Sequence, residues 1–275
     1  MSGLYTEVRG SGPALVLLHG WGLNLRVWDG LTAALSDRFR IIAVDLPGHG
    51  RSAWLPERSS LDGQAAQVRE TVAALAAEYS LLGWSLGGQI ALQLAAAQRD
   101  CGTAHPHAAA AVHRLVLIAA TPRLAGGPDW PHGAPPERLA AQAAGLRTDY
   151  RRTVSDFLEL QVRGSAGGAE ALEQLRAALF AHGRSESASP HLAALARDLE
   201  LLRDTDLRPL LADVTLPALV IAGQYDRVTP PAASRTLAER LPNARYVEIR
   251  RAAHAPFLSH LPELSALLAD FLLRQ

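Results

Sequence analysis

Three residues far apart in the chain have the types and local settings needed for nucleophilic attack on a carbonyl carbon. Ser85 stands in a G-x-S-x-G pattern, Gly83 to Gly87, whose glycines allow a tight strand-to-helix turn that exposes the hydroxyl. A serine hydroxyl needs a general base, and the base needs an acid that orients it. Asp226 and His254 follow Ser85 in that order. We therefore predict Ser85 as the nucleophile, His254 as the base and Asp226 as the orienting acid.

The settings of Asp226 and His254 carry this prediction, because single loop residues of these types are common. Asp226 follows the apolar run 216–221, and His254 follows the run 245–249. Both are thus expected at the carboxyl ends of strands, the edge where open α/β sheets place their sites. Taken alone, a loop aspartate or histidine is more often a helix cap or a solvated group. The shared edge and the chain order together favour catalysis.

A second loop, His19-Gly20-Trp21-Gly22, has the position expected of an oxyanion hole. The tetrahedral intermediate of acyl transfer carries a negative oxygen, which preorganised N–H donors stabilise. Leu86 begins the helix after Ser85, so its backbone N–H is one expected donor. The Trp21 N–H, after the apolar run 15–18, is the other. Without Ser85 this loop would be a plain glycine turn, and we expect His19 to hold it in place rather than act as a base.

The elements that must position these residues alternate along most of the chain. Continuous apolar runs are typical of buried parallel strands, and they occur at 14–18, 41–44, 81–82, 115–118, 216–221 and 245–249. Helical patterns lie between or after them, at 27–35, 64–77, 86–97, 232–241 and 262–273. This order predicts an α/β fold with a mostly parallel central sheet and helices on both faces.

One segment departs from this alternation. Residues 122–136 are rich in proline and glycine, and residues 138–202 have a helical pattern rich in Ala, Leu and Arg, without a strand signal. We therefore predict a helical insertion at residues 122–206, called the lid below. It separates a first part of the core, residues 1–121, from a second part, residues 207–275.

Composition narrows the classes of function. The chain has 275 residues, 48% of them hydrophobic, and 27 basic residues balance 27 acidic ones. A net charge of zero argues against a nucleic-acid or anionic-membrane protein. The single Cys101, the missing signal-peptide pattern and the missing membrane-spanning run lead us to expect a soluble cytoplasmic enzyme or binding protein. The sequence shows no nucleotide-binding motif and no metal-ligand spacing, so we expect no metal or organic cofactor.

Together these loops resemble those of the α/β-hydrolase superfamily. The similarity extends over residues 14–262 and includes HGWG, DLPGHGRS, GWSLGG, GQYDRVTP and AAHAPF. More narrowly, the chain resembles the carboxylesterases of biotin synthesis that act on pimeloyl-acyl-carrier-protein methyl ester. That similarity is carried by LVLLHGWGLN, LGWSLGG, RAAHAPF and the lid segments 152–161 and 204–208. It implies a serine carboxylesterase that cleaves the methyl ester, releases methanol and leaves pimeloyl-acyl-carrier protein.

The resemblance also implies which residues contact the substrate: Trp21, Ser85, Leu86, Phe157, Leu158, Glu159, Leu160, Gln161 and His254. The side-chain types agree in kind, since an apolar slot for a methylene chain would be formed by Trp21, Trp84, Phe157, Leu158 and Leu160. Ordinary helix packing is an equally good reason for Leu158 or Leu160 taken singly.

The carrier protein of such esterases is acidic, and the family recognises it through arginines on the lid. The candidates in this chain are Arg147, Arg151, Arg152 and Arg163. The positive field is weakened by acidic residues of the same segment, Asp149, Asp156, Glu159, Glu170 and Glu173. We expect a monomer that docks the carrier at the lid and has no nucleic-acid or membrane partner.

Two further hypotheses stay open on the sequence. A general short-chain carboxylesterase, a lactonase or a C–C bond hydrolase of the same fold would use the same three residues. A ligand receptor that keeps the fold and signals through its lid belongs to a different class, and the complete oxyanion loop argues against it.

Overall fold

A seven-stranded sheet forms the centre of the molecule. The computed structural model describes residues 3–98, 111–180 and 191–274, so that Cys101 lies outside the described residues. The strand order is β1-β3-β2-β4-β5-β6-β7, with β1 antiparallel to β3 and every other pair parallel. The strands are β1 (Thr6–Arg9), β2 (Ala14–Leu18), β3 (Arg40–Val44), β4 (Glu78–Trp84), β5 (Ala111–Ile118), β6 (Ala218–Gly223) and β7 (Ala244–Ile249).

The predicted α/β fold is confirmed, and the reason lies in the apolar runs. The last four residues of β2, β3, β4 and β5 are buried, as a sheet covered on both faces requires. The sequence did not reveal β1, because its four residues, TEVR, are half-buried or exposed and give no apolar run. This strand closes one edge of the sheet by pairing Thr6 to Arg9 with Val44 to Ile41.

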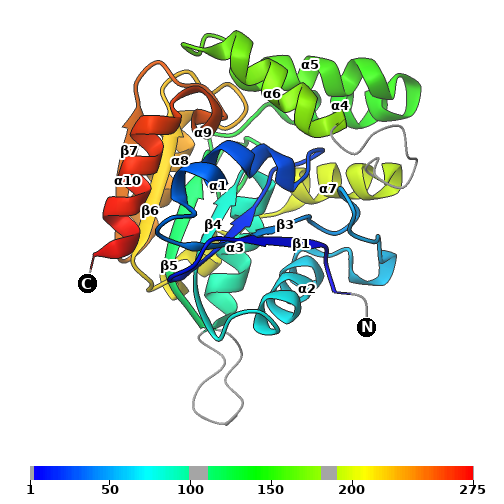
Figure 1. Ribbon diagram of the computed structural model, residues 1–275. Helices are drawn as coiled ribbons and strands as arrows, with labels where there is room; N and C mark the ends of the chain where they lie inside the picture. The colour runs from blue at the N-terminus through cyan, green and yellow to red at the C-terminus, as the bar shows by residue number, and fades with distance from the viewer. Residues whose placement is uncertain (1–2, 99–110, 181–190, 275) are drawn as a thin grey trace.

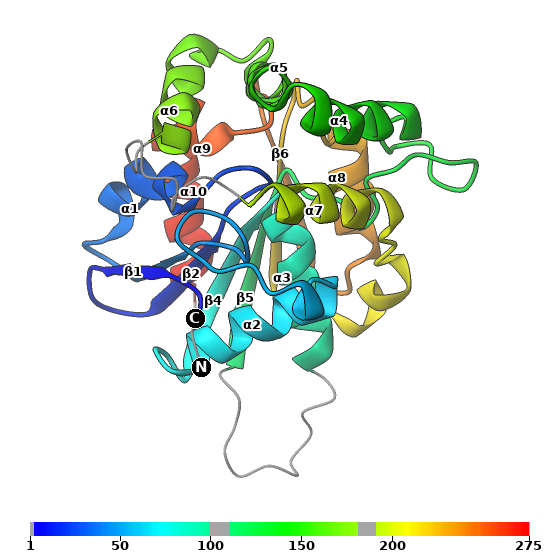
Figure 2. The ribbon, with the colours of Figure 1, turned by 90° about the vertical axis from the view of Figure 1, so that its right-hand side faces the viewer.

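Helices cover both faces of the sheet (Figure 2). One face carries α1 (Asp29–Leu35) and α10 (Leu261–Leu273), and the other carries α2 (Leu61–Ala73), α3 (Leu86–Ala97) and α8 (Pro231–Arg240). The helix predicted at 27–35 is divided into a 3₁₀ turn, η1 (Leu25–Trp28), and α1. The helix predicted at 64–77 begins earlier, because the Ser60 hydroxyl caps α2 by accepting from the Gly63 N–H at 3.0 Å.

Four helices of the lid lie above the edge of the sheet where the parallel strands end (Figure 1). They are α4 (Pro136–Thr148), α5 (Tyr150–Val162), α6 (Gly168–Phe180) and α7 (Leu192–Asp204). Helix α4 packs against both α5 and α7, and α5 packs against α6. The lid therefore stands over the sheet edge to which the sequence assigns Ser85, Asp226 and His254.

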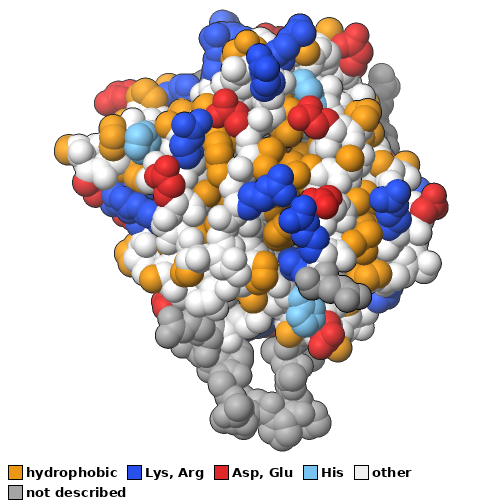
Figure 3. Space-filling model, turned by 90° about the vertical axis from the view of Figure 1, so that its left-hand side faces the viewer, with side chains coloured by type: hydrophobic (Ala, Val, Ile, Leu, Met, Phe, Trp, Pro, Cys, Tyr) orange, Lys and Arg blue, Asp and Glu red, His pale blue; other side chains and the backbone are white. Residues whose placement is uncertain are grey.

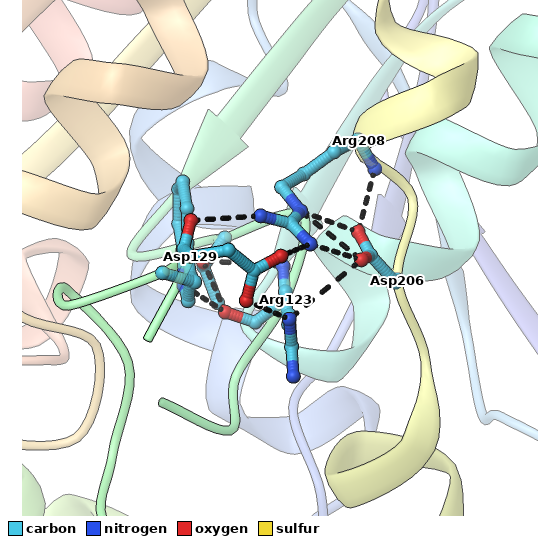
Figure 4. A network of polar contacts seen from close by, with 6 residues as sticks. Arg123, Asp129, Asp206 and Arg208 are labelled. Atoms are coloured by element: carbon cyan, nitrogen blue, oxygen red, sulfur yellow. Dashed lines mark hydrogen bonds and ion pairs between the residues drawn. The ribbon is translucent and has the colours of Figure 1, made fainter. Parts of the chain in front are cut away.

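Ion pairs join the two ends of the lid (Figure 4). Near its start, Arg123 Nη1 contacts Asp129 Oδ1 at 3.0 Å, and near its end Arg208 Nη2 contacts Asp206 Oδ2 at 2.5 Å. A contact of 2.6 Å between Arg208 Nη2 and Asp129 Oδ2 connects the two ends. The Leu207 N–H also donates to the Pro122 carbonyl at 2.9 Å. The lid thus leaves and rejoins the core at one bonded junction.

The outer surface has no strong bias of charge on the side shown in Figure 3. Basic, acidic and apolar side chains are interspersed there, in keeping with the net charge of zero. Among the described residues, no helix is both long and apolar enough to cross a bilayer.

The contact between α3 and the sheet leads to a prediction about stability. A Cβ atom on Gly87 would lie 2.4 Å from the Leu18 carbonyl oxygen and 2.6 Å from the His19 carbonyl oxygen. We expect Gly87→Ala to lower the free energy of unfolding by about 3 kcal/mol, because the backbone of β2 has to move away. Urea denaturation followed by circular dichroism measures this value.

Gly30→Ala is the matched control, since its Cβ would meet only the Leu261 Cδ2 atom at an ordinary 3.5 Å. Its expected change is within about 1 kcal/mol, as alanine favours the helix. Equal losses in the two variants would contradict the tight approach of α3 to β2.

Candidate active site

Ser85 occupies a strained turn between β4 and α3. Its backbone has φ 55° and ψ −115°, a conformation that residues other than glycine seldom adopt. The neighbouring glycines make the turn possible, since a Cβ on Gly83 would lie 2.3 Å from the Gly87 carbonyl oxygen. A Cβ on Gly88 would lie 2.5 Å from the Ala120 Cβ. The glycines of the G-x-S-x-G pattern therefore allow a half-buried serine to lie at the carboxyl edge of the sheet.

Asp226 and His254 are in direct contact. Asp226 Oδ2 accepts from His254 Nδ1 at 2.8 Å, and both side chains are buried. Asp226 Oδ1 accepts from the Val228 and Thr229 N–H groups at 2.8 and 2.9 Å, so the carboxylate is held in one orientation. An acceptor at Nδ1 leaves His254 Nε2 without a proton in the neutral ring, which is the state that a general base requires.

His254 Nε2 is the atom that would face Ser85. It is buried and has no hydrogen-bond partner in the part of the chain that the structure describes. Catalytic hydrogen bonds are often long before substrate binds, so this open nitrogen is compatible with a base that awaits a proton. The loop itself is held on both sides, because Trp84 Nε1 donates to the His254 carbonyl and the His254 N–H donates to the Gln161 carbonyl, each at 2.9 Å.

Two buried histidines hold the predicted oxyanion loop in place. His19 Nε2 accepts from the Leu46 N–H at 3.0 Å, and His49 Nε2 accepts from the Gly22 N–H at 3.1 Å. Burial lowers the pKa of His19 to about 4 and that of His49 to about 3, so both rings are neutral and able to accept. Within the described residues, the backbone N–H groups of Trp21 and Leu86 donate no hydrogen bond. Both donors are thus available for a ligand.

The lid holds the same loop from above through α7. Trp21 Nε1 donates to the Leu195 carbonyl at 3.0 Å. One turn further along α7, Asp198 Oδ1 accepts from Gln64 Nε2 at 2.6 Å, and its Oδ2 lies 3.8 Å from His49 Nε2. The sequence did not single out Asp198 or Gln64, because they lie 134 positions apart in helices without a motif.

The buried Asp198 predicts a pH effect on stability. Burial raises its pKa to about 7, whereas the unfolded chain releases this proton near pH 4. The folded state therefore binds the extra proton, and the stability that this gives is lost as pH rises toward 7. Relative to wild type, we expect Asp198→Asn to gain about 2 kcal/mol in the free energy of unfolding between about pH 5.5 and pH 8.

Urea titrations of both proteins at the two pH values measure this gain. His19 and His49 have lowered pKa values and act in the opposite direction, so only the difference between variant and wild type isolates Asp198. Asp37→Asn, at an exposed position, controls for the change of charge. A difference that stays constant with pH would show that Asp198 is ionised throughout.

A small apolar pocket lies against Ser85 beneath the lid. Three polar residues, Ser85, Arg138 and Gln142, line it together with the apolar side chains of Trp21, Leu124, Ala134, Leu139, Phe157, Leu160, Leu199, Leu202 and Val228. Four of the residues predicted to contact substrate, Trp21, Ser85, Phe157 and Leu160, therefore lie on its wall. The indole of Trp21 and the ring of Phe157 meet edge to face at 5.1 Å.

The other predicted contact residues lie off the pocket wall. Leu158 is buried on the inner side of α5, Glu159 forms an ion pair with Arg176 at 3.3 Å, and Gln161 meets the His254 loop through its carbonyl. Trp84 packs against Trp28 and Phe257 in the core. The sequence also missed the contributions of α4 and α7 to the wall, since their Ala- and Leu-rich patterns do not show which neighbour their apolar faces meet. Among the described residues, no group of histidine, cysteine and acidic side chains is placed to hold a metal ion.

Comparison with known proteins agrees with this geometry. The family described as alpha/beta hydrolase fold matches residues 13–261. The pimeloyl-acyl-carrier-protein methyl ester esterase of Nitrosomonas europaea is 40% identical over 260 residues, 94% of this chain and 95% of the relative. The enzyme of the same name from Aeromonas hydrophila is 39% identical and covers 95% of this chain and 96% of its own.

Solved structures show the same architecture. An esterase from Exiguobacterium antarcticum superposes with a TM-score of 0.82 over 98% of this chain and 94% of its own, at 23% identity. The esterase RhEst1 from a Rhodococcus species has a TM-score of 0.73 at 26% identity, covering 97% of this chain and 93% of its own.

Proposed function

The chain belongs to the alpha/beta hydrolase fold family, and on that premise we propose that it hydrolyses the methyl ester of pimeloyl-acyl-carrier protein. The observation that carries the proposal is a positioned His254–Asp226 pair at the same sheet edge as a strained serine that opens into an apolar pocket. Relatives about 40% identical over nearly the whole chain bear the name of this esterase. The products are pimeloyl-acyl-carrier protein and methanol, and we place the enzyme in the cytoplasm as a monomer.

In the proposed mechanism, His254 Nε2 takes the proton of Ser85 Oγ as that oxygen attacks the ester carbonyl. Asp226 holds the ring by its bond to Nδ1 and stabilises the imidazolium that forms. The free N–H groups of Trp21 and Leu86 stabilise the negative oxygen. His254 then protonates the departing methoxide, and a water activated by the same nitrogen releases the acid from Ser85.

The pocket wall supports a methylene chain as the acyl part. Burial of each CH₂ group against side chains such as Phe157, Leu160 and Leu202 is worth about 0.8 kcal/mol. A pimeloyl group, which has more CH₂ groups to bury, therefore gains more from this pocket than an acetyl group does. A short-chain esterase would gain little from such walls, and a lactonase would need room for a ring.

The proposed carrier-docking residues lie on exposed positions of the lid. Arg147 stands in the last turn of α4, Arg151 and Arg152 in the first turn of α5, and Arg163 at its end. Arg152 lies 3.7 Å from Asp156, which dilutes its charge. Arg151 has no ion pair with a described residue and is the best single probe of docking.

We expect Arg151→Glu to lower the ratio of kcat/KM for the carrier-bound ester to that for p-nitrophenyl acetate by about tenfold at low salt. Steering between unlike charges weakens as counterions screen them, so the loss should shrink at about 0.5 M salt. Steady-state kinetics on both substrates measures the ratio. Arg38→Glu makes the same change of charge at an exposed position outside the lid, so it controls for net charge. An equal loss in that variant would contradict docking at the lid.

The substrate proposal is tested by kcat/KM for purified pimeloyl-acyl-carrier-protein methyl ester against a simple short-chain ester. A large preference for the carrier-bound ester is expected. Growth of a biotin-requiring strain that lacks its own methyl ester esterase provides the cellular test. Failure to restore growth, together with no preference in vitro, would favour a general esterase. Negligible turnover of every ester would favour a receptor.

A further inference from the structure

Helix α4 contributes two polar side chains to an otherwise apolar pocket. Arg138 and Gln142 stand one helical turn apart on the same face, and both line the cavity that opens onto Ser85. Apart from Ser85, every other lining residue is apolar. Neither residue has a part in the mechanism proposed above, so their presence beside leucine, phenylalanine and valine side chains calls for a ligand.

Gln142 has hydrogen-bonding capacity that the protein does not use. Its Nε2 atom is buried and has no hydrogen-bond partner in the described part of the chain. An unpaired buried donor is costly, and native proteins usually supply a partner from solvent or ligand. Because Nε2 only donates, its missing partner is an oxygen acceptor.

Arg138 has similar unused capacity at the solvent-facing rim of the same pocket. Its Nη2 donates to the Arg227 carbonyl at 2.8 Å, and it forms no ion pair with a described residue. Asp226 is the acidic group whose charge acts on it. Asp226 accepts from His254, Val228 and Thr229, and no hydrogen bond or ion pair joins it to Arg138 in the described part of the chain. The remaining N–H groups of Arg138 are free for an anion.

The two groups together have one recognition chemistry. A guanidinium beside an amide N–H presents only donors, and this combination fits the two oxygens of a carboxylate. The apolar wall between these donors and Ser85 suits methylene groups. A ligand that fills the pocket therefore has an ester at Ser85, a methylene chain along the wall and a carboxylate at α4.

We propose that Arg138 and Gln142 form a subsite for the far carboxylate of a free dicarboxylic acid half methyl ester, which the enzyme hydrolyses without a carrier protein. This inference rests on the proposed function, because it needs the ester to react at Ser85. Water supplies the oxygen and a proton, the acyl–oxygen bond breaks, and the products are the dicarboxylate, methanol and one proton. With the carrier-bound substrate, the neutral thioester carbonyl takes the place of the carboxylate and accepts from the same donors.

Three small esters of equal chain length test the subsite: monomethyl pimelate, dimethyl pimelate and methyl heptanoate. They present a carboxylate, a neutral ester carbonyl or a methyl group to α4. In wild type, kcat/KM is expected to be highest for monomethyl pimelate. Arg138→Gln should lower the ratio of kcat/KM for monomethyl pimelate to kcat/KM for methyl heptanoate about tenfold. Gln142→Leu should lower the same ratio about threefold. The loss in Arg138→Gln should be larger for the half ester than for the diester, because only the half ester is charged.

Arg38→Gln removes the same charge at an exposed position outside the lid. It should keep the wild-type ratio of kcat/KM between monomethyl pimelate and methyl heptanoate. A tenfold fall in that variant would mean that net charge, not the subsite, sets the preference. An unchanged ratio in Arg138→Gln would overturn the inference, as would equal losses on all three esters, which would place Arg138 in support of the Arg227 loop. If wild type hydrolyses methyl heptanoate but shows no preference for the half ester, only this inference fails. If wild type hydrolyses neither the three small esters nor the carrier-bound ester, both this inference and the proposed function fail.

Discussion

Replacement of Ser85 by alanine is expected to lower kcat for a short p-nitrophenyl ester by about 10⁴-fold or more. The hydroxyl is the only group at the turn between β4 and α3 that can form the acyl-enzyme, so its removal leaves binding and the oxyanion donors alone. The residual rate reports what the N–H groups of Trp21 and Leu86 contribute without a nucleophile. The variant should also fail to form a covalent acyl-enzyme, because it lacks the oxygen that would be acylated.

The fold of Ser85→Ala should stay intact. Alanine has the same Cβ as serine and meets the same strain at φ 55°, so the free energy of unfolding should change by no more than about 1 kcal/mol. Thermal unfolding and near-ultraviolet circular dichroism provide the check. Turnover close to the wild-type rate in a folded variant would remove Ser85 from the mechanism.

Asp226→Asn is expected to cause the second large loss, about 10³- to 10⁴-fold in kcat. The Oδ1 atom can still accept from Val228 and Thr229, so the loop keeps its shape. The amide nitrogen then faces His254 Nδ1 and donates to it, which places the ring proton on Nε2. A protonated Nε2 in the neutral ring cannot take the proton of Ser85, and the base is lost without any movement of the backbone.

The matched variant Asp37→Asn makes the same chemical change at an exposed position away from the site. Its kcat should stay within about twofold of wild type, as expected for a neutral surface substitution. Comparison of the two variants by kcat and by melting temperature separates catalysis from stability. A loss below tenfold in Asp226→Asn would show that His254 is oriented by its backbone bonds to Gln161 and Trp84 rather than by the carboxylate.

The loops that contain Ser85, Asp226 and His254 could be predicted from the sequence, because their placement follows from local rules. Apolar runs indicated which segments form buried strands, and the carboxyl end of each run placed Asp226 and His254 at one edge. The structure brings these two residues to 2.8 Å although 28 positions separate them. The short, half-exposed strand β1 escaped prediction because it lacks the apolar run that marked the other strands.

The wall of the pocket was not readable in the same way. The lid segment 157–161 contributes Phe157 and Leu160 to the wall, while Leu158 turns into the core and Glu159 to the surface. A helix distributes consecutive side chains around its axis, so a contiguous segment cannot all face one cavity. Only the packing of α5 against its neighbours decides which residues of the segment point inward.

By itself, then, the sequence determined the α/β architecture and the chain order of Ser85, Asp226 and His254. The periodicity of apolar residues and the glycines around a strained turn are properties of short stretches of chain. Tertiary structure alone decided that α4 brings Arg138 and Gln142 into the pocket, and that α7 sets Asp198 against Gln64 and near His49. These contacts join helices without distinctive motifs across long sequence separations. Their partners are selected by the shape of the folded core, which no local pattern encodes.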